Sequence, residues 1–188
     1  TEDNFPAGYN KIATSIVWGN GAVFSTFFSA AFAHILGIQG LPSNPLILHL
    51  GLNPEYMSDY VALGLSESFN GKPSGLPSDQ WPDIWWNIWA MINADAAIAD
   101  YNTVASYVPE GGETKAHTYH WIHTLGELGR LLSGARAVTA DYPAALAFEN
   151  NGVTTYVVYN FTEQLLPVTY SDGQRVDATP FGFTLVTN

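Results

Sequence analysis

The residue pattern of this chain changes once, near Ser133, and that change constrains the fold more than any other feature. Before it, apolar residues recur at helical spacing, and Pro and Gly separate the helical stretches. After it, short β-branched and aromatic runs alternate with turn residues. Asn150-Asn151-Gly152 and Ser171-Asp172-Gly173 are typical of hairpin turns. The sequence therefore predicts an α+β protein, mainly α, with a C-terminal antiparallel β tail.

Pro and Gly set the expected bounds of these elements. Pro54 and Pro82 suit the first turns of helices, and Ser78 or Asp79 could cap the helix that contains Pro82. We expect helices over residues 22–38, 53–69, 81–101 and 114–132, and strands over 144–148, 154–160, 165–170 and 181–186. We accordingly divide the chain into an N-terminal segment (1–21), a helical part (22–133) and a β segment (134–188) packed on it.

Composition limits the possible classes of protein. The 188 residues suit one domain or a substantial piece of a larger one. Hydrophobic residues make up 47%, which allows a core, but charged residues make up only 12%, against roughly 25% in an average globular protein. The surface must therefore be rich in neutral polar and aromatic groups, or be covered by other protein.

The net charge and the targeting signals limit the kinds of molecule that this chain can bind. A formal net charge of −11 argues against nucleic acid, because few cations are available to contact phosphates. The absence of cysteine excludes disulfides and thiolate metal sites. There is no apolar run long enough to span a membrane, and the N-terminus lacks the features of a signal peptide. We expect no membrane partner and favour a secreted protein, although an excised fragment would look the same.

The densest group of chemically active side chains lies between Glu113 and His123. Its rings can stack and its imidazoles can form hydrogen bonds, which suits a flat, hydroxyl-rich ligand such as a carbohydrate. His117 and His120 share a helix face, and His123 lies about 60° further round. A zinc site would need a third ligand and organised outer contacts, so we expect no metal and favour sugar contacts or buried imidazoles.

Five tryptophans lie in this group or in the preceding helix. Core packing explains most of them, because a helix that carries several is usually buried. Trp81 is the exception, since it precedes its helix beside a loop rich in Gly, Pro and Ser, where an exposed ring could stack on a sugar. The five are Trp81, Trp85, Trp86, Trp89 and Trp121.

Several segments together resemble a known family. The most specific is Glu113-Thr-Lys-Ala-His-Thr-Tyr-His-Trp-Ile122, and the others, in chain order with it, are 37–42, 83–85, 139–143, 154–160 and 170–173. In this order they resemble the C-terminal part of glycoside hydrolase family 81, the endo-β-1,3-glucanases. The resemblance runs from about residue 15 to 186, and it departs from many members at Leu36.

The resemblance implies a fold and an activity. Members look like an N-terminal β-sandwich joined to an (α/α)6 barrel, and they cleave internal bonds of β-1,3-glucan with inversion and without a cofactor. This chain would supply the last barrel hairpins and the following strands, with the N-terminal part of the same enzyme and β-1,3-glucan as partners. Independently, a toroid of twelve helices needs about 250 residues or more, which exceeds this chain.

The catalytic acids are expected elsewhere. An inverting hydrolase needs two carboxyl groups roughly 6.5–9.5 Å apart, and the family's paired glutamates and catalytic aspartate lie upstream of the matched part. The acids here, Glu55, Asp59, Asp83, Glu113 and Asp141, are explained by helix first turns, a cap at Glu113 and a turn at Asp141. We therefore assign no catalytic residue. As substrate-binding candidates we name Trp81, Asp83, Glu113, His117, Tyr119, His120 and Trp121.

Two rival functions remain. One is a stand-alone β-glucan-binding module without hydrolytic activity. The other is a structural domain whose aromatic residues all belong to the core.

Overall fold

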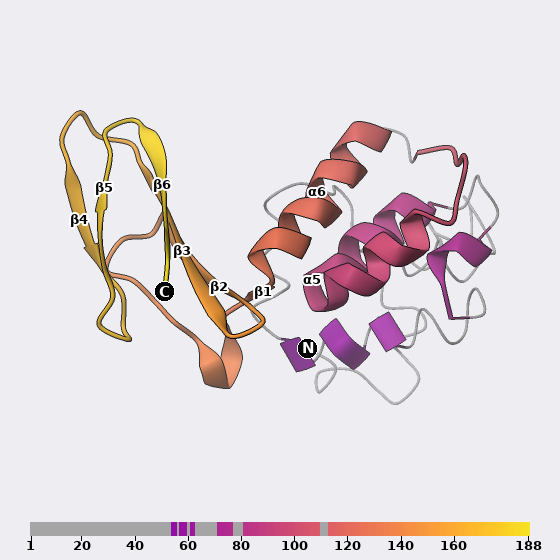
Figure 1. Cartoon of the computed structure of the whole chain (residues 1–188), viewed down its shortest axis with the longest axis horizontal. Coiled ribbons are helices and arrows are strands. Elements are labelled where there is room, and N and C mark those ends of the chain that lie inside the picture. The colour runs from indigo at the N-terminus through magenta and orange to yellow at the C-terminus, as the bar shows by residue number, and fades with distance from the viewer. Residues whose placement is uncertain (1–53, 56, 60, 63–70, 77–80, 110–112) are drawn as a thin grey trace, which may run out of the picture. The chain divides into compact units, whose positions relative to one another are not determined.

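The computed structural model describes residues 54, 55, 57–59, 61, 62, 71–76, 81–109 and 113–188 (Figure 1). The chain divides into two compact units, Thr1–Thr124 and Leu125–Asn188. Helix 22–38, the candidate cap residues Ser78 and Asp79, and the departure at Leu36 lie outside the described residues. An α+β class is confirmed, because described helices are followed by antiparallel sheets.

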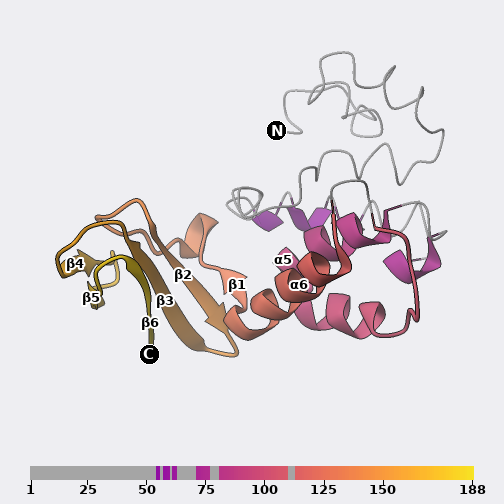
Figure 2. The ribbon, with the colours of Figure 1, turned by 90° about the horizontal axis from the view of Figure 1, so that it is seen from above.

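The first unit contains short helical pieces and two long helices. Residues 54, 55, 57–59, 61 and 62 are helical. The 3₁₀ helix η5 is Pro73–Gly75, and the long helices are α5, Pro82–Tyr101, and α6, Lys115–Leu128. Helix α6 runs past the boundary between the units. Two views show α5 and α6 side by side (Figures 1 and 2).

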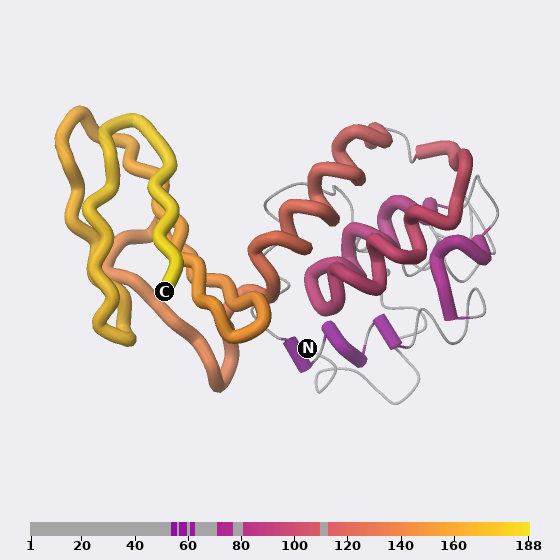
Figure 3. Tube along the Cα trace, viewed as in Figure 1, coloured from indigo at the N-terminus to yellow at the C-terminus, as the bar shows by residue number. Residues whose placement is uncertain are grey.

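Helix α5 begins and bends for local reasons. Trp81 precedes it in the left-handed region (φ 56°, ψ 48°), and Pro82 then fixes a helical φ in the first turn. Asn93 leaves helical geometry (φ −148°, ψ 82°), and its Oδ1 accepts a hydrogen bond from the backbone N–H of Ala96 at 3.1 Å. Asn93 thus caps the second half of α5, as an asparagine at a helix start does. The Cα trace in Figure 3 follows both halves.

The buried residues of α5 include a hydrogen-bonded carboxylate in its last turn. Ile84, Trp85 and Trp86 are buried, as the core interpretation of these tryptophans predicts. Asp100 is also buried and accepts hydrogen bonds from Trp86 Nε1 (2.8 Å), the Ser74 backbone N–H (2.9 Å) and Ser74 Oγ (2.5 Å). These bonds join η5 to the end of α5 and satisfy a charge that would otherwise be costly to bury.

The second unit consists of two antiparallel sheets. The first has the strand order β1-β2-β3-β6, and the second pairs β4 with β5. A 3₁₀ helix, η6 (Gly134–Arg136), lies between β1 and β2. The strands are β1 Arg130–Leu131, β2 Ala145–Asn150, β3 Val153–Asn160, β4 Leu166–Thr169, β5 Arg175–Ala178 and β6 Gly182–Thr187.

The β2–β3 turn matches its sequence. Asn151 (φ 50°) and Gly152 (φ 83°) both take positive φ, as a type I′ turn requires, and Asn150 pairs with Val153. This turn fixes the register of the hairpin, so the hairpin predicted from Asn150-Asn151-Gly152 is confirmed. The turn at Ser171-Asp172-Gly173, between β4 and β5, is confirmed in the same way.

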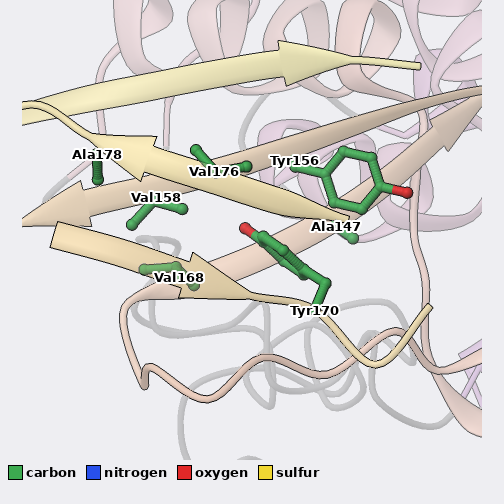
Figure 4. Close-up of a cluster of buried hydrophobic side chains, with 7 residues drawn as sticks. All are labelled: Ala147, Tyr156, Val158, Val168, Tyr170, Val176 and Ala178. Atoms are coloured by element: carbon green, nitrogen blue, oxygen red, sulfur yellow. The ribbon is translucent and has the colours of Figure 1, made fainter. Parts of the chain in front are cut away.

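The core of this unit lies between its two sheets (Figure 4). Alternate residues of each strand point inward, as the period of a strand dictates. Tyr170 lies with its hydroxyl 3.2 Å from the Leu146 carbonyl oxygen and 3.1 Å from that of Val157, so the phenol links β4 to β2 and β3. The buried cluster comprises Ala147, Tyr156, Val158, Val168, Tyr170, Val176 and Ala178.

The helix expected over 114–132 ends earlier than the sequence suggested. Gly129 takes a left-handed conformation (φ 79°), which favours glycine after a helix. The chain then forms β1, which pairs with β2. Asn150 Nδ2 donates to the Gly126 carbonyl at 2.8 Å and the Glu127 carbonyl at 3.1 Å, satisfying acceptors that the end of α6 leaves open.

Candidate functional site

Glu113, His117 and Trp121 form a stripe at four-residue spacing along the start of α6. His117 and Trp121 are neighbours on one face of α6, and Glu113 lies just before the helix, four residues ahead of His117. Glu113 Oε2 lies 2.5 Å from His117 Nδ1. The His117 and Trp121 rings are 6.1 Å apart between centroids. We call these three residues the α6 stripe.

The α6 stripe is partly accessible and joined to α5. The side chain of Glu113 is 6% exposed and that of His117 is 32% exposed. Trp121 is half-buried, and its Nε1 donates to the backbone carbonyl of Asn87 in α5 at 3.0 Å. The indole is therefore held in place by a buried helix, while the imidazole remains reachable from solvent.

Thr114, rather than Glu113, caps α6. The Thr114 hydroxyl accepts a hydrogen bond from the backbone N–H of His117 at 3.0 Å, the usual bond of a threonine cap. The expectation that Glu113 caps this helix is therefore wrong, and its carboxylate is instead bonded to the imidazole. A cap at Thr114 was readable from the sequence, because threonine is among the preferred residues at that position.

Tyr119, His120 and His123 form a second group on α6. The Tyr119 ring lies 5.6 Å from that of His120 and 4.3 Å from that of His123. Tyr119 and His120 are exposed. Ring contacts thus group His120 with Tyr119 and leave His117 with Glu113 and Trp121. In the part of the chain that the structure describes, no three His, Asp or Glu side chains are arranged to hold a metal ion.

The candidates at the start of α5 are less accessible. Asp83 lies fully buried in the first turn of the helix, and Trp81 is half-buried rather than exposed. Asn87 is fully buried one turn later, and its side-chain amide has no hydrogen-bond partner among the described residues. Its backbone carbonyl, by contrast, accepts the Trp121 indole N–H.

Lys115 has a role that the sequence left open. Its Nζ lies 5.2 Å from the centroid of the Tyr107 ring, a cation–π contact. Burial raises the pKa of the Tyr107 phenol above its ordinary value. The Lys115 amine therefore helps to hold the first turn of α6 against Tyr107 in the connection that follows α5.

The remaining acids are structural or exposed. Glu55 and Asp59 are exposed residues of a helical stretch. Asp141 Oδ1 accepts a hydrogen bond from the Thr169 backbone N–H at 2.9 Å, and the Asp141 N–H donates to the Thr169 carbonyl at 3.0 Å. Asp141 therefore holds β4, whereas the sequence predicted that it holds the turn before Pro143.

Asp100 and Asn87 are buried polar residues that the sequence analysis did not single out. One signal was available for Asp100. A carboxylate in the last turn of a helix opposes the helix dipole, so it needs partners elsewhere. Asn87 offered no comparable signal, because an amide within an aromatic helix is equally compatible with an exposed face.

Two curated relatives match almost the whole chain. A glucan endo-1,3-beta-D-glucosidase from Thermobifida fusca is 36% identical over 179 residues, which is 95% of this chain and 22% of the relative. A protein of the same name from Acetivibrio thermocellus is 34% identical over 186 residues, 99% of this chain and 23% of the relative. No protein-family model matches the chain.

A solved structure agrees with the sequence matches. A mutant of a glycoside hydrolase family 81 protein from Clostridium thermocellum has a TM-score of 0.70 and 34% identity, over 83% of this chain and 20% of that one. By sequence and by fold, the chain matches a part of these glycoside hydrolases. Its family is glycoside hydrolase family 81, as the resemblance around Glu113–Ile122 indicated. The chain spans about a fifth of the length of these relatives.

Among the described residues, no helix is long and apolar enough to cross a bilayer.

Proposed function

We propose that this chain forms part of an inverting hydrolase that cleaves internal bonds of β-1,3-glucan, and that it contributes one wall of the substrate groove. The relatives named as endo-1,3-β-glucanases support the activity. The α6 stripe is the observation that supports the chain's position in the wall of the substrate groove. In the same proposal α5 and α6 are a late hairpin of an (α/α)6 barrel, and the whole protein is secreted to reach its polysaccharide.

The Glu113–His117 pair prepares the imidazole to contact a sugar. An ionised carboxylate can only accept hydrogen bonds, so His117 Nδ1 carries the proton that lies toward Glu113. In the neutral ring Nε2 is then a hydrogen-bond acceptor, which suits a sugar hydroxyl. With one nitrogen held by Glu113, the ring keeps a fixed orientation before the ligand arrives.

Trp121 adds an apolar surface next to this acceptor. An indole pairs an apolar ring with one N–H donor, and here that donor is bonded to Asn87. The ring is therefore available for stacking without leaving a polar group unsatisfied. A ring beside a fixed acceptor is the combination that a pyranose recognises, with its apolar face and its equatorial hydroxyls.

The positions of the acids support a non-catalytic role for this segment. Asp83 is fully buried, and Glu113 is nearly so and already bonded to His117. Asp141 holds β4. Hydrolysis with inversion needs one acid that protonates the leaving oxygen and one base that activates water. These three acids have structural bonds or burial that oppose either task.

Titration calorimetry with laminarihexaose tests the proposal. We expect His117→Gln to weaken the affinity of the 188-residue chain about tenfold, the loss of one good hydrogen bond. Glu127→Gln, an exposed change on the same helix, serves as a control and should leave the affinity unchanged. Equal affinity in all three proteins would mean that His117 does not contact the sugar, which would contradict the assignment of the wall. No binding by the unmodified chain would favour the structural domain.

A reducing-sugar assay on laminarin tests the catalytic part. The chain alone should release no sugar above background. Turnover that Asp83→Asn or Glu113→Gln abolishes would place a catalytic acid in this segment and contradict the proposal.

A further inference from the structure

The face of the four-stranded sheet that points away from the core is apolar over most of its length, and Thr155 pairs with Thr187 at one end of it. Residues directly opposite in an antiparallel pair point to the same side. Val157 pairs with Leu146 on one side and Leu185 on the other, and Tyr159 pairs with Phe183. Phe161 continues this side, since its ring lies 4.5 Å from that of Tyr159. We call Leu146, Val157, Tyr159, Phe161, Phe183 and Leu185 the outer apolar face.

Four of its side chains are exposed, and those of Val157 and Tyr159 are half-buried. Phe161 is 65% exposed, Phe183 68% and Leu185 57%. None of the six residues carries a charge or an amide, and together they offer one hydroxyl, that of Tyr159. Exposed apolar residues that lie together, rather than singly, mark interaction sites on soluble proteins.

The β4–β5 sheet of the same unit has a solvent-facing side that serves as a comparison. On β4 and β5 the outward residues Thr169, Arg175 and Asp177 are exposed, and Arg175 Nε lies 3.6 Å from Asp177 Oδ1. An antiparallel sheet with one face in water shows this alternation of apolar and polar residues. The four-stranded sheet lacks it, so its outer face is built for contact with another surface.

The geometry of the rings favours a protein over a sugar. The Tyr159 ring makes interplanar angles of 63° with Phe161 and 67° with Phe183, so the three rings form no flat platform for a pyranose. A glucan would also need several polar groups, because each of its hydroxyls loses water on binding. The six residues of the outer apolar face provide one, and the exposed Thr187 adds a second at the end of the sheet. An apolar protein surface needs neither a platform nor these groups.

We propose that the outer apolar face docks against another domain of a longer family 81 chain. The Thermobifida and Acetivibrio relatives carry more than three quarters of their length outside the match. Each such relative therefore supplies additional protein linked to this sheet. Covalent linkage gives a high effective concentration, so a face of modest area suffices. The 12% content of charged residues fits a surface that other protein covers.

This inference rests on membership of family 81 and not on the glucan contacts of the α6 stripe. It is tested in a chimera in which this chain replaces the matched 179 residues of the Thermobifida relative. Hydroxyl-radical footprinting then compares the chimera with the 188-residue chain. We expect oxidation of Phe161 and Phe183 to fall about fivefold or more in the chimera, as burial of exposed rings requires. Exposed Pro167, on the outer side of β4, should react equally in both proteins.

A double variant provides a second readout. Phe183→Asp with Leu185→Asp should lower the melting temperature of the chimera by about 5 °C or more, because two charges would be buried in the interface. The same changes should lower the melting temperature of the 188-residue chain much less, because both residues are exposed there and only the Phe183–Tyr159 ring contact is lost. Thr169→Asp on the polar sheet is the matched control and should shift neither protein. The unmodified relative, footprinted at its aligned positions, gives the answer if the chimera does not fold.

Three results would overturn the proposal. The first is equal oxidation of Phe161 and Phe183 in the chimera and the isolated chain. The second is a dimer of the isolated chain, seen by sedimentation and dissociated by the double variant, which would make a second copy the occupant. The third is protection of these rings by laminarihexaose. Because the double variant leaves the α6 stripe intact, its affinity for laminarihexaose separates failure here from failure of the groove-wall assignment.

Discussion

Glu113 Oε2 lies 2.5 Å from His117 Nδ1, across one turn at the start of α6. A nearly buried carboxylate thus fixes a partly exposed imidazole. The Glu113 carboxylate therefore orients the His117 imidazole.

We expect Glu113→Gln to weaken binding of laminarihexaose about tenfold, because the amide no longer holds the imidazole by a charge-assisted hydrogen bond. Calorimetric titration of the purified chain measures the change. Glu127→Gln is the matched control. An unchanged affinity for Glu113→Gln would mean that His117 orientation does not matter to the ligand.

Asp100→Ala should lower the free energy of unfolding by about 2–4 kcal/mol, since it leaves the buried Trp86 N–H and the Ser74 donors without their acceptor. Denaturant titration followed by tryptophan fluorescence measures it. Asp95→Ala, an exposed position on the same helix, should change stability by less than about 0.5 kcal/mol. Similar losses for both variants would show that the Asp100 bonds contribute little.

Gly129→Ala should destabilise the chain by about 3 kcal/mol or more. A Cβ there would lie 2.0 Å from the backbone oxygen of Glu149, and the residue has a φ of +79°. Gly152→Ala tests φ alone, because a Cβ at Gly152 (φ +83°) meets nothing within 4 Å, and it should cost about 1 kcal/mol. Thermal melting of both variants measures the difference. Equal costs would show that the strand backbone moves aside freely.

Stability should fall as pH rises from about 10 to 12. Burial raises the pKa of Tyr156 and of Tyr170 to about 12, from an ordinary 10.0. In this window the unfolded chain has lost both phenolic protons while the folded chain keeps them, so unfolding releases protons and alkali favours it. The stabilisation is complete below pH 10 and lost above the folded pKa.

Melting temperatures across this window, with tyrosinate absorbance on the folded chain, measure the effect. Tyr170→Phe should flatten the dependence on pH, because it removes one of the buried phenols whose pKa is raised. Two buried phenols that titrate near pH 10 in the folded chain would contradict the expectation.

Local sequence signals predicted the parts of the fold that depend on local chemistry. The Asn151-Gly152 turn needed two residues that tolerate positive φ, and the sequence supplies them. Helix α5 was expected over 81–101 and runs Pro82–Tyr101. By contrast, β1 has two residues and continues the apolar pattern of α6, and β5 has only two inward apolar residues, so neither strand was predicted.

The candidate site divides in the same way. The sequence placed Glu113 and His117 among the substrate-binding candidates, but it did not predict their contact, because Glu113 was expected to cap the helix and instead precedes the Thr114 cap. The Asp100–Ser74 bonds join residues 26 apart in the chain, and no local pattern reports such a pairing. The exposure of Trp81 was overestimated for a related reason, because the residues that half-bury it belong to the tertiary fold.

The contrast between the two sheets of the second unit also governs how the isolated chain behaves as a solute. A formal net charge of −11 makes copies repel one another at neutral pH and low ionic strength. Dissolved ions reduce the range of this repulsion to about 8 Å at 0.15 M. The hydrophobic attraction between the exposed Phe161 and Phe183 rings of different copies is not screened in this way. Dilute buffer therefore keeps the molecules dispersed, and strongly excluded salts such as sulfate should precipitate them through β3 and β6.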